Sequence, residues 1–268
     1  MRKIVVMFLA LGLLLFSASL VSAQDANEWS QYQKDKANTG SMSVTVPDEG
    51  IVSSKTSAIE ARDGSEPVVA GSRAYVYTGV DDTSGSIVCL DLATGEKAWE
   101  TEVEPPTFWS SSSPAVSGGF VYIGSGSKVC ALNALDGSRV WERYLGSGAA
   151  VVNSSPTIDG DRLFIGDWNN NNDGRYLCLD AKNGDIIWEF ALDADCHAQS
   201  TPAVDGGMVF VGQFGANFGV PEGKVWCLDR NSGKPVSTWG PNGYFTPEDN
   251  LDVTGSVSVY EDYIYFTD

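Results

Sequence analysis

A single histidine limits the kinds of catalysis open to this chain. His197 is the only histidine among the 268 residues. Ser-His-Asp and Cys-His centres both need an imidazole beside the nucleophile, so either centre would depend on His197. A metal centre built from several histidines is excluded. Cys196 precedes His197, but Asp193 stands where the first cysteine of a c-type haem motif would be, which excludes that attachment site.

An Asn-rich stretch offers oxygen atoms at alternating positions. Asn169, Asn171 and Asp173 are followed directly by Gly174. This spacing loosely resembles a calcium loop, in which carboxylate and amide oxygens alternate along the chain. The first position is Asn rather than the usual Asp. The sequence therefore leaves open a weak Ca²⁺ site or a polar hairpin that binds nothing, and we favour the hairpin.

The cysteines follow the same spacing as a set of turn glycines. Cys89, Cys178 and Cys227 each lie six residues before such a glycine, whereas Cys130 lies seven before Gly137. An offset of one residue moves a side chain to the other face of a strand. A disulfide needs Cα atoms within about 7 Å, and equivalent positions in successive repeats should lie further apart. We therefore predict unpaired buried thiols, which are typical of a weakly oxidising environment.

These residues sit on a repeated unit of about 45 residues. Strand-start prolines occur at Pro67, Pro114, Pro156 and Pro202, spaced 47, 42 and 46 residues apart. After each proline come a turn, an apolar strand, a third strand, a turn glycine and a fourth strand with a tryptophan. Four short antiparallel strands in such a period predict a β-propeller blade. The four tryptophans are Trp99, Trp141, Trp188 and Trp239.

The repeats predict an all-β fold in which residues 51–268 form the propeller. Residues 24–50 form an N-terminal lead-in. The last repeat has its first two strands and lacks the third and fourth, so we expect a fragment of a larger ring. A natural ring of four or five blades is the alternative. The predicted blades span residues 66–111, 112–154, 155–200 and 201–255, with a partial blade at 256–268.

The repeat register points to one end of the ring as a candidate binding face. Connections from the last strand of one blade to the first strand of the next converge on the axial channel. Trp109 and His197 lie five residues before a strand-start proline, and Asn153 and Gln199 lie three before. The indole could stack on a flat ring, and the other three side chains could hydrogen-bond it. The alternative is that these polar groups satisfy strand ends. We predict a small-molecule or protein ligand at this face.

The N-terminus has the layout of a secretory signal peptide over residues 1–23. Arg2 and Lys3 precede an uncharged apolar run, and Val21 and Ala23 occupy the positions that a signal peptidase reads. We expect a mature chain that begins at Gln24, lies outside the cytoplasm and has no membrane span. An uncleaved anchor is the alternative. The formal net charge of -18 argues against binding to nucleic acids or anionic lipids.

The turn between the third and fourth strands resembles the tryptophan-docking motif of the PQQ-type (pyrroloquinoline-quinone) propeller family. Its first copy reads Cys89-x-Asp91-x-x-Thr94-Gly95-x-x-x-Trp99, and later copies repeat it. In the fourth copy the tryptophan comes two residues late. The family includes quinoprotein dehydrogenases and non-catalytic scaffolds, such as the propeller lipoprotein of the outer-membrane barrel-assembly machinery. The resemblance implies a structural docking role for the four tryptophans.

The same resemblance leaves PQQ and Ca²⁺ open as cofactors. Enzymes of the family need a catalytic Asp, a Glu/Asn/Asp calcium set and usually a pair of adjacent cysteines. None of these maps residue by residue onto this chain, and no two of its cysteines are adjacent. The sequence therefore favours an exported or cell-envelope binding or scaffold module without catalysis. The alternative is a fragment of a PQQ- and Ca²⁺-dependent quinoprotein dehydrogenase.

Overall fold

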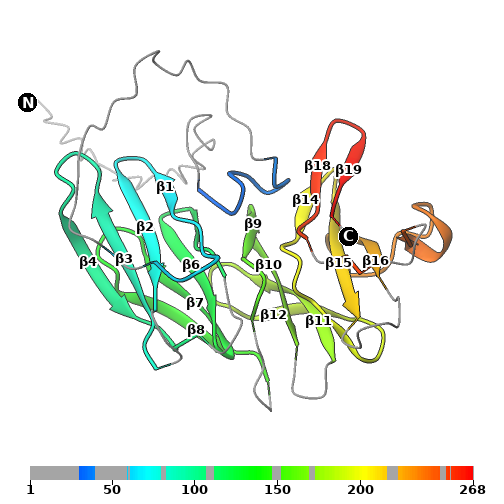
Figure 1. Cartoon of the computed structure of the whole chain (residues 1–268), viewed down its shortest axis with the longest axis horizontal. Coiled ribbons are helices and arrows are strands. Elements are labelled where there is room, and N and C mark those ends of the chain that lie inside the picture. The colour runs from blue at the N-terminus through cyan, green and yellow to red at the C-terminus, as the bar shows by residue number, and fades with distance from the viewer. Residues whose placement is uncertain are drawn as a thin grey trace, which may run out of the picture.

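The chain folds as a β-propeller, whose blades are small antiparallel sheets set side by side around an axis (Figure 1). No helix among the described residues is long and apolar enough to cross a membrane. The computed structural model describes residues 30–39, 59, 61–79, 83–106, 112–146, 152–168, 173–215, 223–247, 252–253 and 255–267.

The first three blades are regular four-stranded sheets in which the order across the sheet is the order along the chain. Alternation of buried and exposed side chains along the outer strands leaves one tryptophan buried in each. Blade one contains β1 (Val68–Ala70), β2 (Arg73–Thr78), β3 (Ser86–Asp91) and β4 (Lys97–Glu102). Blade two contains β5 (Ala115–Ser117), β6 (Phe120–Ser125), β7 (Lys128–Asn133) and β8 (Arg139–Tyr144). Blade three contains β9 (Thr157–Asp159), β10 (Arg162–Trp168), β11 (Gly174–Asp180) and β12 (Ile186–Ala191).

The fourth blade has an extra inner strand and an irregular outer one. β13 pairs with the far end of β15, so this sheet has five strands. The fifth sheet contains only two described strands. Blade four contains β13 (Cys196–His197), β14 (Ala203–Asp205), β15 (Met208–Gly215), β16 (Lys224–Asp229) and β17 (Tyr244–Phe245), with the 3₁₀ helix η1 (Pro241–Gly243) before β17. Blade five contains β18 (Ser258–Tyr260) and β19 (Tyr263–Tyr265).

Trp239 does not lie on a fourth strand, contrary to the sequence prediction. An isolated bridge joins Leu228 to Pro235, and regular pairing resumes only at β17. Pro235 and Pro241 lack the N–H group that a ladder bond needs, which explains why no continuous strand forms between them. Trp239 therefore lies in a loop ahead of η1.

Each turn between the third and fourth strands is closed by the Asp or Asn that ends the third strand. In blade one, Asp91 Oδ1 accepts hydrogen bonds from the backbone N–H groups of Ala93 and Thr94, at 2.9 and 3.0 Å. Such Asx turns hold the following residues in a tight reversal. Gly95 then takes a φ of 73°, which L residues with a side chain rarely adopt.

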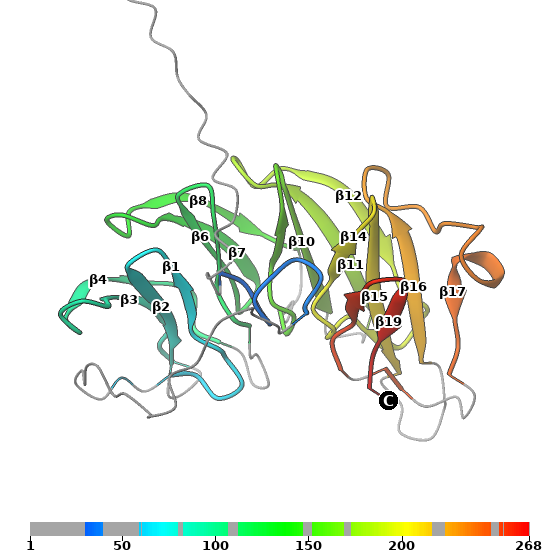
Figure 2. The ribbon, with the colours of Figure 1, turned by 90° about the horizontal axis from the view of Figure 1, so that it is seen from above.

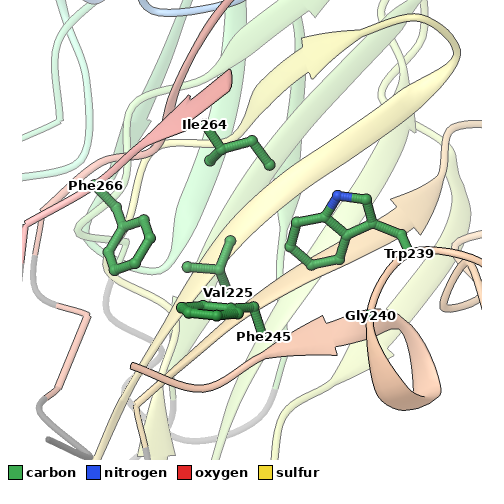
Figure 3. Close-up of a pocket in the computed structure, with 6 residues that line it drawn as sticks. All are labelled: Val225, Trp239, Gly240, Phe245, Ile264 and Phe266. Atoms are coloured by element: carbon green, nitrogen blue, oxygen red, sulfur yellow. The ribbon is translucent and has the colours of Figure 1, made fainter. Parts of the chain in front are cut away.

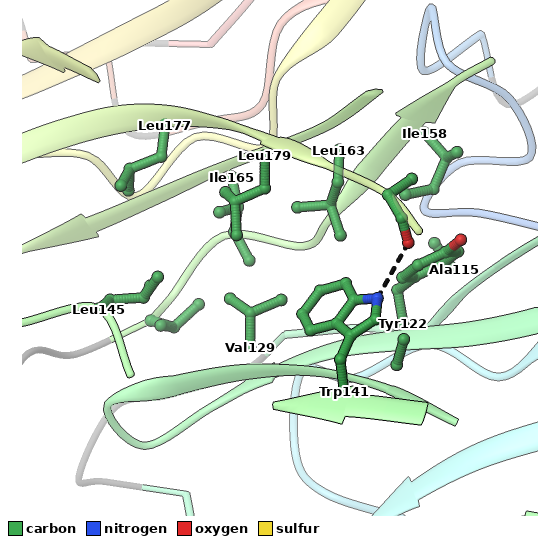
Figure 4. Packing of buried hydrophobic residues seen from close by; sticks show 13 residues of the cluster. Ala115, Tyr122, Val129, Trp141, Leu145, Ile158, Leu163, Ile165, Leu177 and Leu179 are labelled. Carbon is green, nitrogen blue, oxygen red and sulfur yellow. Dashed lines mark hydrogen bonds between the residues drawn. The ribbon is translucent and has the colours of Figure 1, made fainter. Parts of the chain in front are cut away.

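The tryptophans of the first three blades connect each blade to the next. Trp141 packs into a buried apolar cluster with Leu163, Ile165 and other residues of blade three (Figure 4). Its indole N–H donates to the Ala181 carbonyl at 3.0 Å. Replacing such a buried tryptophan with alanine would cost about 3–5 kcal/mol. The equivalent bonds join Trp99 to the Ala134 carbonyl at 3.2 Å and Trp188 to the Arg230 carbonyl at 3.0 Å.

The lead-in segment, residues 30–39, crosses the first strands of four successive blades (blue in Figure 2). The backbone N–H of Val116 donates to the Ser30 carbonyl, and that of Val204 donates to the Lys36 carbonyl, both at 2.6 Å. The Gln31 side chain accepts from Ile158 N–H at 2.7 Å and donates back to the Ile158 carbonyl at 3.3 Å. The lead-in thus supplies hydrogen bonds that a neighbouring strand would otherwise give.

All five cysteines are buried and free. Cys89 on β3 and Cys130 on β7 belong to the same apolar cluster between blades one and two. Burial raises the pKa of the Cys130 thiol to about 11 and that of Cys227 to about 12. These thiols therefore behave as small apolar core residues.

Candidate functional site

The candidate site lies where blades three and four meet, at the end of the blades where β10 stops and β11 begins. β13 carries His197 to this place and pairs it with Phe214 on β15. Gly174, the first residue of β11, allows the backbone of β13 to approach closely. A Cβ atom there would lie 2.5 Å from the Cys196 carbonyl oxygen. A larger residue at position 174 would push β13, and His197 with it, away from blade three.

His197 is the centre of an aromatic group. Its ring stacks on the Trp168 indole with centroids 4.0 Å apart and an interplanar angle of 18°. The Phe214 ring is tilted by 39° to the imidazole, with the two centroids 6.0 Å apart. Burial lowers the pKa of His197, so the ring is neutral at pH 7. Gln199 Nε2 lies 3.2 Å from His197 Nδ1. With the amide donating, the neutral ring carries its proton on Nε2.

The structure brings together two of the four residues in the predicted ligand-binding set. His197 and Gln199 are in contact, whereas Trp109 lies outside the described residues. Asn153 is half-buried on the connection into β9, and its Oδ1 has no hydrogen-bond partner among the described residues. Trp168 was not in the predicted set. Its position in the repeat could have identified it. Trp168 ends a second strand, and the turns between second and third strands lie at the same end of the propeller as the connections between blades.

Asp167, next to Trp168, is held in a buried ion pair. Its side chain is 2% exposed and accepts from Arg175 Nε at 2.9 Å and Nη2 at 3.1 Å. Arg175 also pairs with Glu189 at 2.8 Å and donates to the Leu145 carbonyl of blade two. Burial raises the pKa of Asp167 despite the arginine. Asp167 therefore holds Arg175 within blade three, and Arg175 joins this blade to blade two through the Leu145 carbonyl.

A second carboxylate is held in a similar way between blades three and four. Asp193 pairs with Lys224 and accepts from Gln213 Nε2 at 2.9 Å. Burial alone would raise the pKa of Asp193, but these two partners outweigh it and lower that pKa. Gln213 is fully buried and also accepts from the Trp226 indole at 3.0 Å. Lys224 Nζ lies 4.8 Å from the centroid of the Tyr244 ring. The network positions the linker after β12.

The described residues include only part of the predicted calcium loop. Asn169 and Asn171 of the predicted metal loop lie outside the described residues, and Asp173 is exposed. No group of three or more His, Cys, Asp or Glu side chains comes together in the part of the chain that the structure describes. Asp167 and Asp193 are each paired with a cationic side chain.

Comparison with known proteins places the fold in one family. The family model described as outer membrane protein assembly factor BamB, which is a PQQ-type repeat model, matches residues 19–239 and 150–267. No curated protein matches the chain. Among solved structures, BamB from Moraxella catarrhalis is 23% identical with a TM-score of 0.50, and the alignment covers 72% of this chain and 51% of that one.

Quinoprotein dehydrogenases are similar in fold as well. The quinohemoprotein alcohol dehydrogenase from Pseudomonas putida HK5 gives a TM-score of 0.68 at 13% identity, over 87% of this chain and 42% of that one. The enzyme from Comamonas testosteroni gives 0.65 at 18% identity, over 86% and 43%. The chain thus spans about half the length of these structures. The repeats and blades are those of a propeller, and the family model matches most of the chain. The chain therefore belongs to the PQQ-like β-propeller family that includes BamB.

Proposed function

We propose that this chain is an exported, cell-envelope PQQ-like propeller that binds a ligand between blades three and four and performs no catalysis of its own. The observation that carries the proposal is the stack of His197 on Trp168, with Phe214 and Gln199 beside it. Aromatic walls with a few convergent polar groups are typical of sites for small molecules.

An unsatisfied polar atom supports a ligand there. Trp168 Nε1 is buried and has no hydrogen-bond partner among the described residues. Leaving such a group unpaired costs about 1–3 kcal/mol. A ligand or ordered water that satisfies this atom would recover part of that cost.

The state of the carboxylates supports binding rather than catalysis. A general base must be able to reach a substrate proton. Asp167 directly precedes Trp168, Asp193 lies four residues before His197, and both are engaged with a cation. Asp193 pairs with Lys224 of blade four, and Asp167 pairs with Arg175, which bonds to blade two, so these contacts favour a structural role for both carboxylates.

Because the chain has one histidine, the imidazole NMR signals of His197 report on this site alone. We expect flat heteroaromatic compounds to shift these signals and the Trp168 indole signal saturably. Trp168→Ala should abolish the effect. Leu135→Ala, at an exposed turn between a third and a fourth strand, is the control and should bind normally. Equal binding by both variants would reject the site.

A quinoprotein dehydrogenase is the second candidate, favoured by the fold shared with two quinohemoprotein alcohol dehydrogenases. The test is to supply PQQ and Ca²⁺ and to measure dye-linked oxidation of short alcohols and aldoses. Turnover that depends on PQQ and is lost in Trp168→Ala would replace the binding module with the enzyme. The similarity to BamB, an assembly factor by name, instead favours a protein partner.

A further inference from the structure

Two features of blade four lie outside the candidate ligand site. The first is an apolar pocket of about 280 Å³, which is lined by Trp239, Phe245, Ile264 and Phe266, among others (Figure 3). No charged side chain among the described residues lines this pocket. It lies between blade four and the two described strands of blade five, so it is part of a blade interface. The second is a cluster of charged side chains where blades three and four meet, at the other end of β10 from Trp168.

Three cationic side chains meet two carboxylates in this cluster. Its members are Lys36 of the lead-in, Asp159, Asp161 and Arg162 of blade three, and Arg230 of blade four. The turn between β9 and β10 is thereby held against the turn that follows β16. Three cations and two carboxylates leave the cluster with one excess positive charge, although the whole chain has a formal net charge of -18. An anion is therefore attracted to this cluster rather than to the rest of the surface.

Asp159 is fully engaged within the cluster. Its Oδ1 accepts from Lys36 Nζ at 2.7 Å, and its Oδ2 accepts from Arg230 Nε at 2.5 Å. Arg230 Nη2 also donates to the main-chain carbonyl of Asp159 at 2.6 Å. Burial alone would raise the pKa of the Asp159 carboxyl, but its bonds to Lys36 and Arg230 outweigh burial and lower that pKa. One ionised carboxylate thus balances two cations and fixes the position of the Arg230 guanidinium.

Arg162 is the poorly satisfied member of the cluster. Its Nε is buried and has no hydrogen-bond partner among the described residues. Its Nη1 donates to the Cys178 sulfur at 3.8 Å, and sulfur is a weak acceptor. Asp180 lies opposite Arg162 in the sheet register, but its Oδ1 accepts from the backbone N–H groups of Lys182 and Asn183 in the next turn. Since an unpaired buried donor on a charged group is costly, Arg162 needs an acceptor that these side chains do not give.

Arg73 shows how the same position is satisfied in blade one. It starts β2 as Arg162 starts β10, and its Nη1 donates to the carbonyls of Ala134 and Leu135 in the next blade, at 2.8 and 2.6 Å. Ala134 follows the residue that ends its third strand, and the residue in the same place of blade four is Arg230. A second guanidinium at that turn repels Arg162 and keeps it from the turn carbonyls.

Asp161 marks the place of the missing acceptor. Its Oδ1 lies 3.5 Å from both Arg162 Nε and Arg230 Nη2. Both distances are longer than the ~2.7–2.9 Å of a charge-assisted hydrogen bond. The Asp161 side chain is 65% exposed, so it can turn into solvent without disturbing the blade. A Cβ atom at Gly160, the preceding residue, would approach nothing closer than Arg230 Nη2, at 3.7 Å, so there is room beside the two guanidinium groups.

We propose that Arg162 and Arg230, with Lys36 beside them, form a binding site for a small oxyanion of the phosphate class. The anion takes the place of the Asp161 carboxylate and accepts from Arg162 Nε and Arg230 Nη2, while Asp161 turns into solvent. Two guanidinium groups suit such an oxyanion because each presents several N–H donors in a planar fork. The site joins blades three and four, and it uses none of the residues of the candidate ligand site.

The free ion, rather than the phosphate group of a lipid, is the proposed ligand. The formal net charge of -18 predicts repulsion between this chain and an anionic bilayer. A free ion reaches the cluster without bringing such a surface close to the protein. Vesicles that contain phosphatidylglycerol therefore serve as a second probe. We expect the chain not to bind them through Arg162. Vesicle binding that is lost in Arg162→Gln, without any response to inorganic phosphate, would reject the free ion.

The main test titrates the intact chain with inorganic phosphate at constant ionic strength and follows the arginine Nε–H groups by NMR. We expect the Arg162 signal to shift saturably, with a half-maximal effect at about 1 mM or below. The Arg73 signal should stay in place, because that guanidinium already bonds two carbonyls. An unshifted Arg162 signal, or equal unsaturable shifts of both signals, would overturn the proposal.

Variants of the chain separate an anion site from a structural ion pair. Arg162→Gln should weaken phosphate binding at least about tenfold. Lys97→Gln is the matched control, because it removes one exposed positive charge from a turn in blade one and should leave the affinity unchanged. Asp161→Asn removes the competing carboxylate, so phosphate should bind about three- to tenfold more tightly. A merely structural Asp161 gives no such gain, and unchanged or weaker binding in Asp161→Asn would reject the site.

Discussion

At the scale of single residues, His197 differs most from a surface histidine. Burial lowers its pKa below the ordinary value of 6.5. Between the folded and unfolded pKa values, the unfolded chain binds more protons, so stability falls as pH drops below about 6.5. We predict that the free energy of unfolding in urea decreases from pH 7 to pH 5.5. His197→Gln should lose this part of the pH dependence, because the carboxylates titrate alike in both proteins. Identical slopes would contradict the burial of His197.

The five cysteines give a second residue-scale prediction. Burial raises the pKa of the Cys178 thiol to about 11, so little reactive thiolate exists at pH 8 in the folded protein. We expect all five thiols to resist alkylation in native buffer and all five to be labelled after denaturation without a reductant. Mass spectrometry counts the labels. Fewer than five labels on the denatured chain would reveal a disulfide and contradict the predicted distances between blades.

At the scale of elements, the contact between a tryptophan and the next turn joins neighbouring blades. Gly184 has a φ of 73°, and a Cβ atom there would lie 2.7 Å from the Trp141 ring. Gly118 has a φ of 58° and open space around it. Both alanine variants should incur the cost of left-handed backbone, about 1–2 kcal/mol. Gly184→Ala should lose a further ~1–3 kcal/mol from overpacking. Denaturant unfolding of the two variants measures the difference, and equal losses would show that the turn can move.

The lead-in is the second element whose contribution can be isolated. Gln31 is buried and bonds both backbone groups of Ile158. Gln31→Ala would leave these groups unpaired, at a cost of about 1–3 kcal/mol. Gln33 lies two residues away and is half-buried, with only side-chain partners. Gln33→Ala should therefore cost less in the same unfolding experiment. Hydrogen exchange at the Ile158 amide should accelerate in Gln31→Ala alone, and unchanged exchange would show that the lead-in does not protect β9.

At the scale of the whole molecule, the acidic charge and the predicted N-terminal signal peptide bear on where the protein acts. The formal net charge of -18 predicts repulsion from phosphate backbones and anionic membranes. Export is a prediction from residues 1–23, which lie outside the described residues. We expect the exported protein to begin at Gln24, as intact-mass measurement would show. Ala23→Gln should block cleavage. An exported protein that keeps residues 1–23 would support the alternative of a membrane anchor.

The sequence by itself determined the blades, because each blade is built from local antiparallel hairpins. Turn glycines such as Gly95 and the spacing of the strand-start prolines act over a few residues, so they are readable without a structure. The repeat period also indicated the end of the ring on which His197 and Gln199 meet. Trp168 could not be predicted in this way, because its contact with His197 depends on how two blades pack against each other.

Only the tertiary structure decided the remaining contacts. Gln31 meets Ile158 across 127 residues of chain, and no local pattern encodes such a pairing. The break in the fourth outer strand follows from the position of Pro235 opposite Leu228, which only the sheet register reveals. Trp99, Trp141 and Trp188 are buried because each packs against the following blade. A propeller interface is made by two blades, and a residue's sequence specifies only its own side of it.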